Sequence, residues 1–183
     1  MRVITGTARG RALETVAGLD VRPTTVKVKE AIFSSINFEI EGATVLDLFC
    51  GSGQMGIEAL SRKARFCVFV DNAKNSQEVT KKNLASTGLF EQARVVAMDY
   101  KSFLETTNEL FDIAFLDPPY SKGFVQEVLP LLALKMSEAG VILVEHERSD
   151  VLPQEVGGFD RVKQYNYGRI SVSAYRRKLG VTS

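Results

Sequence analysis

From residue 43 onward, short runs of β-branched and aromatic residues alternate with longer stretches that have helical spacing. The short runs are apolar at nearly every position, as expected for strands whose sheet is covered by helices on both faces. The expected strands are Thr44–Leu48, Phe66–Val70, Arg94–Ala97, Phe111–Leu116 and Gly140–Glu145. The expected helices lie near residues 55–63, 73–87, 100–107 and 122–135. This alternation predicts an α/β fold with a doubly wound, mainly parallel sheet.

The end of the chain has a different pattern. Two further apolar runs, at about 160–167 and 170–177, have no helical stretch between them. The sequence Tyr167-Gly168-Arg169 is typical of a tight turn. We therefore expect the sheet to finish in an antiparallel hairpin.

The first 40 residues also depart from the α/β rhythm. Two short apolar segments flank Gly6 and Gly10, which predicts a small hairpin. A helix-patterned run follows from Val26 to Ile36, with Thr24 or Thr25 as its N-cap. We interpret residues 1–40 as a hairpin and helix appendage, too short to hold its own core, and residues 41–183 as the main domain.

Composition narrows the class of protein. An apolar fraction of 45% and a charged fraction of 25% are ordinary for a soluble globular chain. No apolar run approaches the roughly 18 residues that a membrane span needs, and the N-terminus lacks the apolar core of a signal peptide. Cys50, Cys67 and His146 are too few for a Cys/His metal site. We expect a cytoplasmic protein with reduced core thiols, no metal and no membrane partner.

The small net charge of +1 hides an uneven distribution. Residues 1–30 carry a net charge of +3 and residues 160–178 carry +5, so the middle of the chain is acidic. If the two ends meet, their face could attract a phosphate backbone, although simple solvation of the ends would give the same pattern. The candidate RNA-binding residues are Arg9, Arg11, Arg22, Thr24 and Lys27.

A glycine-rich turn follows the first expected strand, in the sequence Asp47-Leu48-Phe49-Cys50-Gly51-Ser52-Gly53. Gly51 and Gly53 permit backbone conformations and close approaches that a side chain would forbid. Asp71 ends the next strand, where its carboxylate could accept hydrogen bonds from a ribose. A tight strand-to-helix turn without a ligand is the alternative interpretation.

Two ligands compete for such a turn, a dinucleotide and S-adenosylmethionine. A dinucleotide places its pyrophosphate at the helix N-terminus, whereas S-adenosylmethionine carries a cationic sulfonium. Asp47 and Asp99 add two more carboxylates at strand ends, which favours the cationic ligand. Asp99 taken alone could equally be a helix N-cap.

A second motif, Asp117-Pro118-Pro119-Tyr120, follows the strand Phe111–Leu116. Consecutive prolines have no N–H, so this turn offers acceptors and almost no backbone donors. An aromatic amine could donate to Asp117 and to the Pro118 carbonyl while Tyr120 stacks on the ring. In an open α/β sheet, ligands bind beyond the carboxyl ends of the strands. If the strands before Asp47 and Asp117 are neighbours, methyl donor and amine share one crevice.

Together these motifs resemble class I methyltransferases that act on exocyclic amines. The N-terminal segments Gly6–Leu13, Arg22–Thr25 and Lys29–Phe33, with Gly56–Arg62 and Tyr167-Gly168, resemble the RsmD-type 16S rRNA guanine-N2 methyltransferases over almost the whole chain.

The resemblance implies a seven-stranded sheet with an antiparallel last strand and methylation of guanine N2 in 16S rRNA within the small ribosomal subunit. It implies S-adenosyl-L-methionine as donor, S-adenosyl-L-homocysteine as product, and a monomer. It implies that Phe49, Gly51, Gly53, Asp71 and Asp99 surround the cofactor and that Asp117, Pro118, Pro119 and Tyr120 form the catalytic site around the guanine. We expect Asp47, Asn72 and Tyr100 to bind the cofactor as well. Two alternatives stay open: methylation of adenine N6 or another planar amine, and a non-catalytic rRNA-binding assembly factor.

Overall fold

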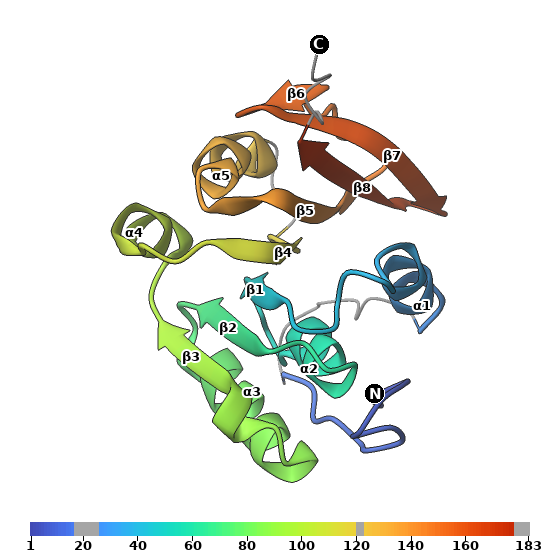
Figure 1. The fold of residues 1–183 in the computed structure, drawn as a ribbon, viewed down its shortest axis with the longest axis vertical. Coiled ribbons are helices and arrows are strands. Elements are labelled where there is room, and N and C mark those ends of the chain that lie inside the picture. The colour runs from blue at the N-terminus through green and yellow to red at the C-terminus, as the bar shows by residue number, and fades with distance from the viewer. Residues whose placement is uncertain (17–25, 120–122, 178–183) are drawn as a thin grey trace.

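The computed structural model describes residues 1–16, 26–119 and 123–177. Its centre is one eight-stranded sheet in the order β3-β2-β1-β4-β5-β8-β7-β6 (Figure 1). Five strands run parallel: β1 (Thr44–Leu48), β2 (Phe66–Asp71), β3 (Ala93–Ala97), β4 (Phe111–Leu116) and β5 (Met136–Glu147). The strand order reverses between β1 and β4, which is where a doubly wound sheet forms its ligand crevice.

The C-terminal part of the sheet is antiparallel, as the sequence predicts. It consists of β6 (Glu155–Val156), β7 (Phe159–Tyr167) and β8 (Ile170–Arg177). The last strand, β8, is inserted between β5 and β7, and it pairs with both in antiparallel fashion. The seven expected strands are all present, and the two-residue β6 extends the edge by one more.

Helices cover both faces of the sheet. They are α1 (Val26–Ser35), α2 (Gln54–Ser61), α3 (Lys74–Thr87), α4 (Tyr100–Thr106) and α5 (Phe124–Ala133), with a short 3₁₀ turn, η1 (Phe90–Gln92). Side chains of α4 and α5 pack on one face of the sheet, against β2, β4 and β5. The other face packs against α1, α2, part of α3 and the N-terminal segment.

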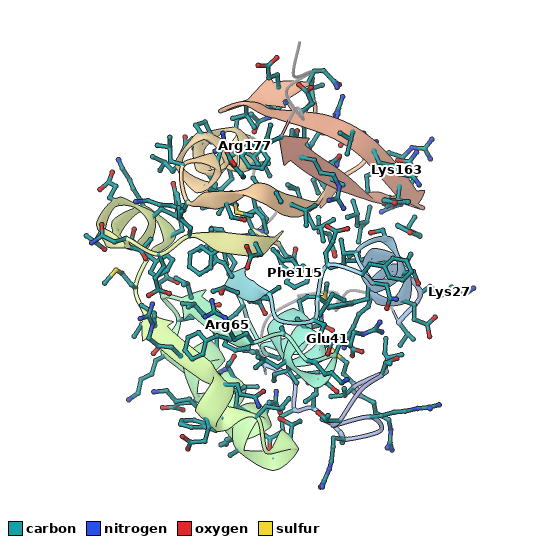
Figure 2. All side chains as sticks on the ribbon, viewed as in Figure 1. Lys27, Glu41, Arg65, Phe115, Lys163 and Arg177 are labelled. Atoms are coloured by element: carbon teal, nitrogen blue, oxygen red, sulfur yellow. The ribbon has the colours of Figure 1, made fainter. Side chains whose placement is uncertain are left out.

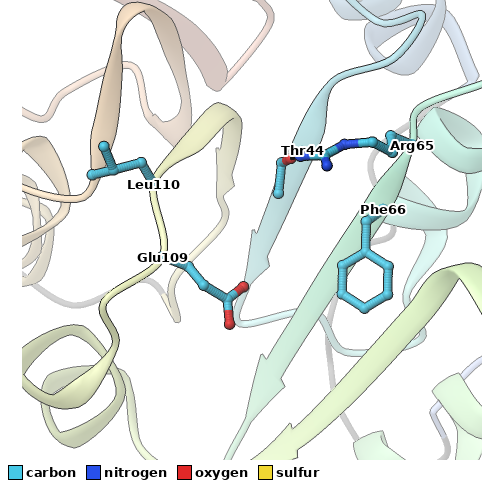
Figure 3. Close-up of a pocket in the computed structure, with 5 residues that line it drawn as sticks. All are labelled: Thr44, Arg65, Phe66, Glu109 and Leu110. Atoms are coloured by element: carbon cyan, nitrogen blue, oxygen red, sulfur yellow. Dashed lines mark hydrogen bonds between the residues drawn. The ribbon is translucent and has the colours of Figure 1, made fainter.

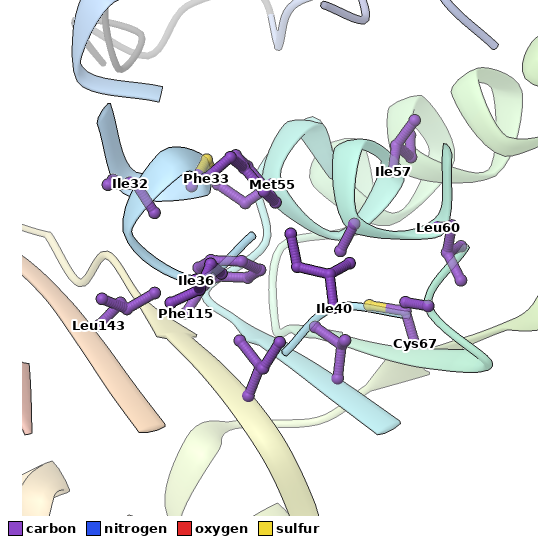
Figure 4. Close-up of a cluster of buried hydrophobic side chains, with 14 of the residues drawn as sticks. Ile32, Phe33, Ile36, Ile40, Met55, Ile57, Leu60, Cys67, Phe115 and Leu143 are labelled. Carbon is purple, nitrogen blue, oxygen red and sulfur yellow. The ribbon is translucent and has the colours of Figure 1, made fainter. Parts of the chain in front are cut away.

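The core on the α1/α2 face joins the N-terminal helix to the central strands. Phe33 of α1 and Phe115 of β4 have ring centroids 5.4 Å apart, and both side chains are buried (Figure 4). Ile57 of α2 is fully buried in the same cluster. Burying an aromatic or large aliphatic side chain contributes about 1.5–3 kcal/mol, so this cluster fixes α1 and α2 firmly on the sheet.

The N-terminal segment packs on α2 and forms only the beginnings of the expected hairpin. Arg2 and Ala12 form one isolated antiparallel bridge. Gly6, at a φ of 90°, lies so close to α2 that a Cβ there would meet the carbonyl oxygen of Ser61 at 1.7 Å. The Ser61 hydroxyl in turn donates to the Thr5 carbonyl at 2.6 Å. The contact requires a glycine, so Gly6 fixes where the segment sits.

One buried carboxylate joins this segment to both helices. The side chain of Glu58, on α2, accepts from the backbone N–H groups of Ile4 and Thr5 at 2.8 and 2.9 Å. It also lies 2.9 Å from the Lys29 ammonium of α1 and 3.0 Å from Arg62 Nε. Residues 1–16 and α1 therefore share a single anchor on the helix that follows the glycine turn.

The expected boundaries of the elements agree closely with the structure, except at β5. This strand begins at Met136 and pairs with Phe111 before an irregularity in the register. The polar residues Ser137 and Glu138 conceal this first part of the strand in the sequence. The N-cap expected at Thr24 or Thr25 lies outside the described residues. None of the described helices is long and apolar enough to cross a membrane.

Candidate active site

The glycine turn leaves the carboxyl end of β1 with three residues in the left-handed region. Phe49, Gly51 and Gly53 have φ values of 65°, 55° and 75°. A Cβ on Gly51 would meet no described atom within 4 Å, so the backbone there faces open space. A Cβ on Gly53 would instead lie 2.9 Å from Thr80 Cγ2. Gly53 therefore permits a close approach to α3, and Gly51 is the glycine that leaves open space.

Side chains from α3 hold the carbonyl groups of this turn. The Thr80 hydroxyl donates to the Gly51 carbonyl at 2.9 Å, and the Asn83 amide donates to the Ser52 carbonyl at 2.9 Å. The buried Asn83 also exchanges hydrogen bonds with the backbone of Glu14 at 2.8 and 3.0 Å. The turn is thus rigid, and the end of the described N-terminal segment is tied to it.

Asp47 lies beneath the turn, buried in β1. Its Oδ2 accepts from the Gly56 N–H in the first turn of α2 at 2.9 Å. Burial raises the pKa of Asp47 to about 7, the Gly56 hydrogen bond opposes this, and the nearby Asp71 adds to it. A positive charge above the turn would stabilise the ionised form of this carboxylate.

The other expected cofactor-binding residues follow β2 and β3. Asp71 accepts from the backbone N–H groups of Gly51 and Ala73 at 3.0 and 2.9 Å, and Asn72 beside it is exposed. Asp99 is the N-cap of α4, where its side chain accepts from Ser102 N at 3.0 Å. Both carboxylates therefore have a structural role. Asp99 is also exposed, so its carboxylate could accept a further hydrogen bond from a ligand.

An aromatic cluster at the same edge was only partly expected. Phe49, Tyr100 and Phe124 have ring centroids 5.1–5.5 Å from one another. All three rings are partly exposed. Phe49 and Tyr100 were among the expected residues, whereas Phe124 was not, because nothing in the local sequence separates the first residue of α5 from an ordinary core position.

The Asp-Pro-Pro turn lies beside the glycine turn, as the sequence predicts. β1 and β4 are hydrogen-bonded neighbours in parallel, with Leu48 opposite Leu116, so Phe49 and Asp117 both leave the sheet at the same edge. Pro118 is buried and Pro119 is exposed. Tyr120 lies outside the described residues. The structure thus places the two motifs on adjacent strand ends.

Asp117 shares its surroundings with a carboxylate that sequence reasoning missed. Burial raises the pKa of Asp117 well above its ordinary value, with further contributions from the charges of Glu145 and Asp47. Glu145 is buried near the end of β5, the strand next to β4. Strand alternation could have indicated this position, but only once the pairing of β4 with β5 was known.

The candidate RNA-binding residues are partly described. Arg9, Arg11 and Lys27 are exposed, and Figure 2 shows Lys27 and Lys163 at the periphery of the molecule. Arg22 and Thr24 lie outside the described residues. One basic residue of the C-terminal region already has a partner: Arg176 forms a bidentate ion pair with Glu39 at 2.7 and 2.9 Å. It is therefore less available to bind phosphate.

A hollow of about 320 Å³ lies at the opposite edge of the sheet, by the amino ends of β1 and β2. It is lined by Thr44, Arg65, Phe66, Glu109 and Leu110 (Figure 3). Neither the glycine turn nor the Asp-Pro-Pro turn contributes to this hollow, so we do not assign the cofactor or the substrate to it. Among the described residues, no group of His, Cys, Asp and Glu could hold a metal ion.

The strand order, the inserted antiparallel β8 and the glycine turn after β1 together define the class I methyltransferase fold. Residues 1–176 match the family described as Conserved hypothetical protein 95. The chain belongs to this family.

Named relatives agree with this assignment. YlbH of Bacillus subtilis is 39% identical over 183 residues, which span 97% of this chain and 100% of that protein. Ribosomal RNA small subunit methyltransferase D of Escherichia coli K12 is 32% identical over 180 residues, covering 97% of this chain and 90% of the relative.

Solved structures show the same fold. The structure of yhhF from Escherichia coli is similar with a TM-score of 0.85 and 33% identity, covering 97% of this chain and 98% of that one. SMU.776, a protein described as complexed with SAH, has a TM-score of 0.68 at 18% identity over 81% of this chain and 48% of that one, which shows the fold alone. The family and fold identify this chain as a methyltransferase.

Proposed function

We propose that this protein transfers a methyl group from S-adenosylmethionine to N2 of a guanine in small-subunit 16S rRNA. The observation that carries the proposal is the adjacency of the two motifs. The glycine turn after β1 and the Asp-Pro-Pro turn after β4 leave neighbouring parallel strands at one edge of the sheet.

The residues at the glycine turn fit S-adenosylmethionine. The open space at Gly51 gives room for an extended ligand against the backbone. The buried Asp47 is costly to ionise alone, since its pKa is about 7, and a cationic ligand would offset that cost. Asp71 and Asp99 would accept from ribose and adenine groups, and Asn72, Phe49 and Tyr100 would contact the same ligand.

The chemistry at the neighbouring turn suits an aromatic amine. S-adenosylmethionine supplies an activated methyl carbon, and its transfer to an amine releases the neutral thioether S-adenosylhomocysteine and one amine proton. Asp117 and the Pro118 carbonyl would accept the two amine N–H groups and so hold the nitrogen with its lone pair free. Pro119 keeps the turn free of a competing donor, and Tyr120 would stack on the base.

Asp117 has a further use once the methyl group has moved. Because the pKa of Asp117 is raised well above its ordinary value, its carboxylate is a better proton acceptor than an exposed aspartate. It could therefore take the proton that the amine releases. No metal is needed for this chemistry, because the methyl donor is already activated.

The substrate assignment rests on relatives. The Escherichia coli and Haemophilus influenzae relatives are both named ribosomal RNA small subunit methyltransferase D, and each aligns over at least 96% of this chain. The exposed Arg9, Arg11 and Lys27, with Arg22 and Thr24 from the segment between them, supply candidate phosphate contacts. We place the protein with the ribosome in the cytoplasm, acting as a monomer.

Incubating small subunits that lack the modification with the purified protein and labelled S-adenosylmethionine tests the proposal. We expect label in 16S rRNA and recovery of N2-methylguanosine after digestion to nucleosides. N6-methyladenosine would instead support the planar-amine alternative. RNA binding without any transfer would mean a non-catalytic assembly factor, and either of these results would overturn the guanine N2 proposal.

A further inference from the structure

Two carboxylates lie near the Asp-Pro-Pro turn, one just after the end of β4 and one near the end of β5. In the register of β4 with β5, Phe115 is opposite Leu143 and Leu116 is opposite Val144. Asp117 and Glu145 are the next residues along: Asp117 follows the end of β4, and Glu145 lies within β5, two residues before that strand ends. Side chains alternate along a strand, so Glu145 points to the face on which Leu143 packs, which is the face with α1 and α2.

Burial and charge show that the two groups share one environment. Glu145 is 6% exposed, and its charge is one of the causes that raise the pKa of Asp117. Two neighbouring carboxylates shielded from water repel each other when both are ionised. An N–H group of a ligand donated to each carboxylate would stabilise its ionised form.

We propose that Glu145 selects guanine by accepting a hydrogen bond from its N1–H while Asp117 holds the 2-amino group of the same base. The inference rests on the function proposed above and extends it to the choice of base. Glu145 would then be a specificity-determining residue that contacts the substrate.

The edge chemistry of the bases supports this assignment. Guanine presents the N1–H and the 2-amino group side by side, so two neighbouring groups of its edge are donors. Adenine presents its 6-amino group beside N1, which is an acceptor. If the 6-amino group took the place of the guanine 2-amino group, N1 would face the Glu145 carboxylate, and two acceptors repel each other. The turn itself adds only acceptors, because Pro118 and Pro119 have no N–H. A site with two carboxylates and no backbone donor is therefore complementary to guanine and opposed to adenine.

A modified RNA separates this role from a structural one. In 2-aminopurine the 2-amino group is present, but N1 carries no hydrogen. We would measure kcat/KM with small subunits whose 16S rRNA carries either guanine or 2-aminopurine at the methylated position. The proteins compared are wild type, Glu145→Gln, and Glu147→Gln as a matched control on the exposed end of the same strand. Cofactor affinity measured by calorimetry shows whether each variant is folded.

Wild type and Glu147→Gln should prefer guanine by about tenfold to a hundredfold, which is the usual worth of a specific base contact. Glu145→Gln should reduce this preference at least about tenfold, because its carboxamide can donate to the bare N1 of 2-aminopurine. Equal rates of wild type on the two RNAs would overturn the inference even if Glu145→Gln fails to fold. A folded Glu145→Gln with an unchanged preference would overturn it as well. Absence of transfer to the guanine substrate by wild type would instead count against the proposed function.

Discussion

The buried Asp47 links the stability of the protein to pH. Its pKa of about 7 means that folding encloses a carboxylate that resists ionisation. In the unfolded chain the same group ionises near pH 4. Between these values the folded protein holds a proton that the unfolded chain has lost, so the contribution of Asp47 to the free energy of unfolding falls as pH rises from about 4 to about 7.

This behaviour gives a first prediction. In Asp47→Asn the part of the pH dependence that Asp47 causes should disappear, and it amounts to roughly 4 kcal/mol, an order-of-magnitude value. Urea denaturation of both proteins between pH 4 and 8 measures it. Parallel stability curves for the two proteins would show that Asp47 ionises normally in the fold.

Asp117 gives the second prediction at this scale. Asp117→Asn keeps the shape of the side chain but replaces one acceptor oxygen by a donor, so kcat should fall by about a hundredfold or more while cofactor affinity stays nearly unchanged. Single-turnover kinetics with calorimetry measure the two quantities.

Asp112→Asn is the matched control for this variant. Asp112 lies on β4, the strand that Asp117 follows, and its side chain accepts from Thr44 N and Ser137 Oγ at 2.9 and 2.8 Å. The Asp112→Asn substitution should therefore lower stability and leave kcat unchanged. An Asp117→Asn enzyme that turns over at the wild-type rate would remove Asp117 from the mechanism.

At the scale of elements, the glycine turn and the helices around it form one rigid unit. The two glycines have different neighbours, which gives a third prediction. Gly53→Val should lower the melting temperature, because its side chain would collide with Thr80 of α3. Gly51→Val should lower it less and should weaken binding of S-adenosylmethionine more, because its side chain would enter open space. Thermal denaturation and calorimetry separate the two effects, and the reverse order would contradict the geometry of the turn.

The junction at Glu58 gives a fourth prediction. Glu58→Ala removes the acceptor of two backbone N–H groups and leaves the buried Lys29 without its ion-pair partner. Breaking a buried pair in this way should cost about 3–5 kcal/mol. Glu41→Ala, which removes a solvent-exposed partner of Lys63, should cost less than about 1 kcal/mol. Equal losses in the two variants would mean that Glu58 does not anchor the N-terminal segment.

The elements themselves were largely predictable from the sequence, and the reasons are local. Buried parallel strands such as Thr44–Leu48 and Phe111–Leu116 are continuous apolar runs, and their bounds agree with the structure. The beginning of β5 was not predicted because the polar Ser137 and Glu138 interrupt its apolar pattern. The insertion of β8 between β5 and β7 could not be predicted, because pairing between distant strands leaves no local signal.

The candidate site was predictable only where a motif marks it. Gly51 and Asp117 belong to short sequences with a clear chemical meaning, and the structure brings them to one edge of the sheet. Glu145 and Phe124 reach that edge through strand pairing and helix placement, which the sequence does not show. His146, which follows the expected strand Gly140–Glu145, is buried within the longer β5 with its Nε2 2.9 Å from Ser173 Oγ.

For the molecule as a whole, the fifth prediction concerns its basic surface. Arg9 and Arg11 are exposed on the N-terminal segment that packs on α2. Replacing both with Ala should weaken binding to 16S rRNA at low salt and reduce the dependence of log K on log salt by about one for each phosphate that the protein no longer binds. Glu14→Ala, in the same segment, is a control that should not reduce the slope. A slope unchanged by the two arginine substitutions would show that this segment does not contact phosphate.

The central claim is that methyl donor and amine meet in one cleft between the ends of β1 and β4. A crystal structure of the protein with S-adenosylhomocysteine tests it most directly. We expect the ligand to lie against Gly51, with its sulfur facing the Asp117 carboxylate across a space that a methyl group and an amine nitrogen would fill. A ligand bound elsewhere, or one whose sulfur faces away from the Asp-Pro-Pro turn, would contradict the claim.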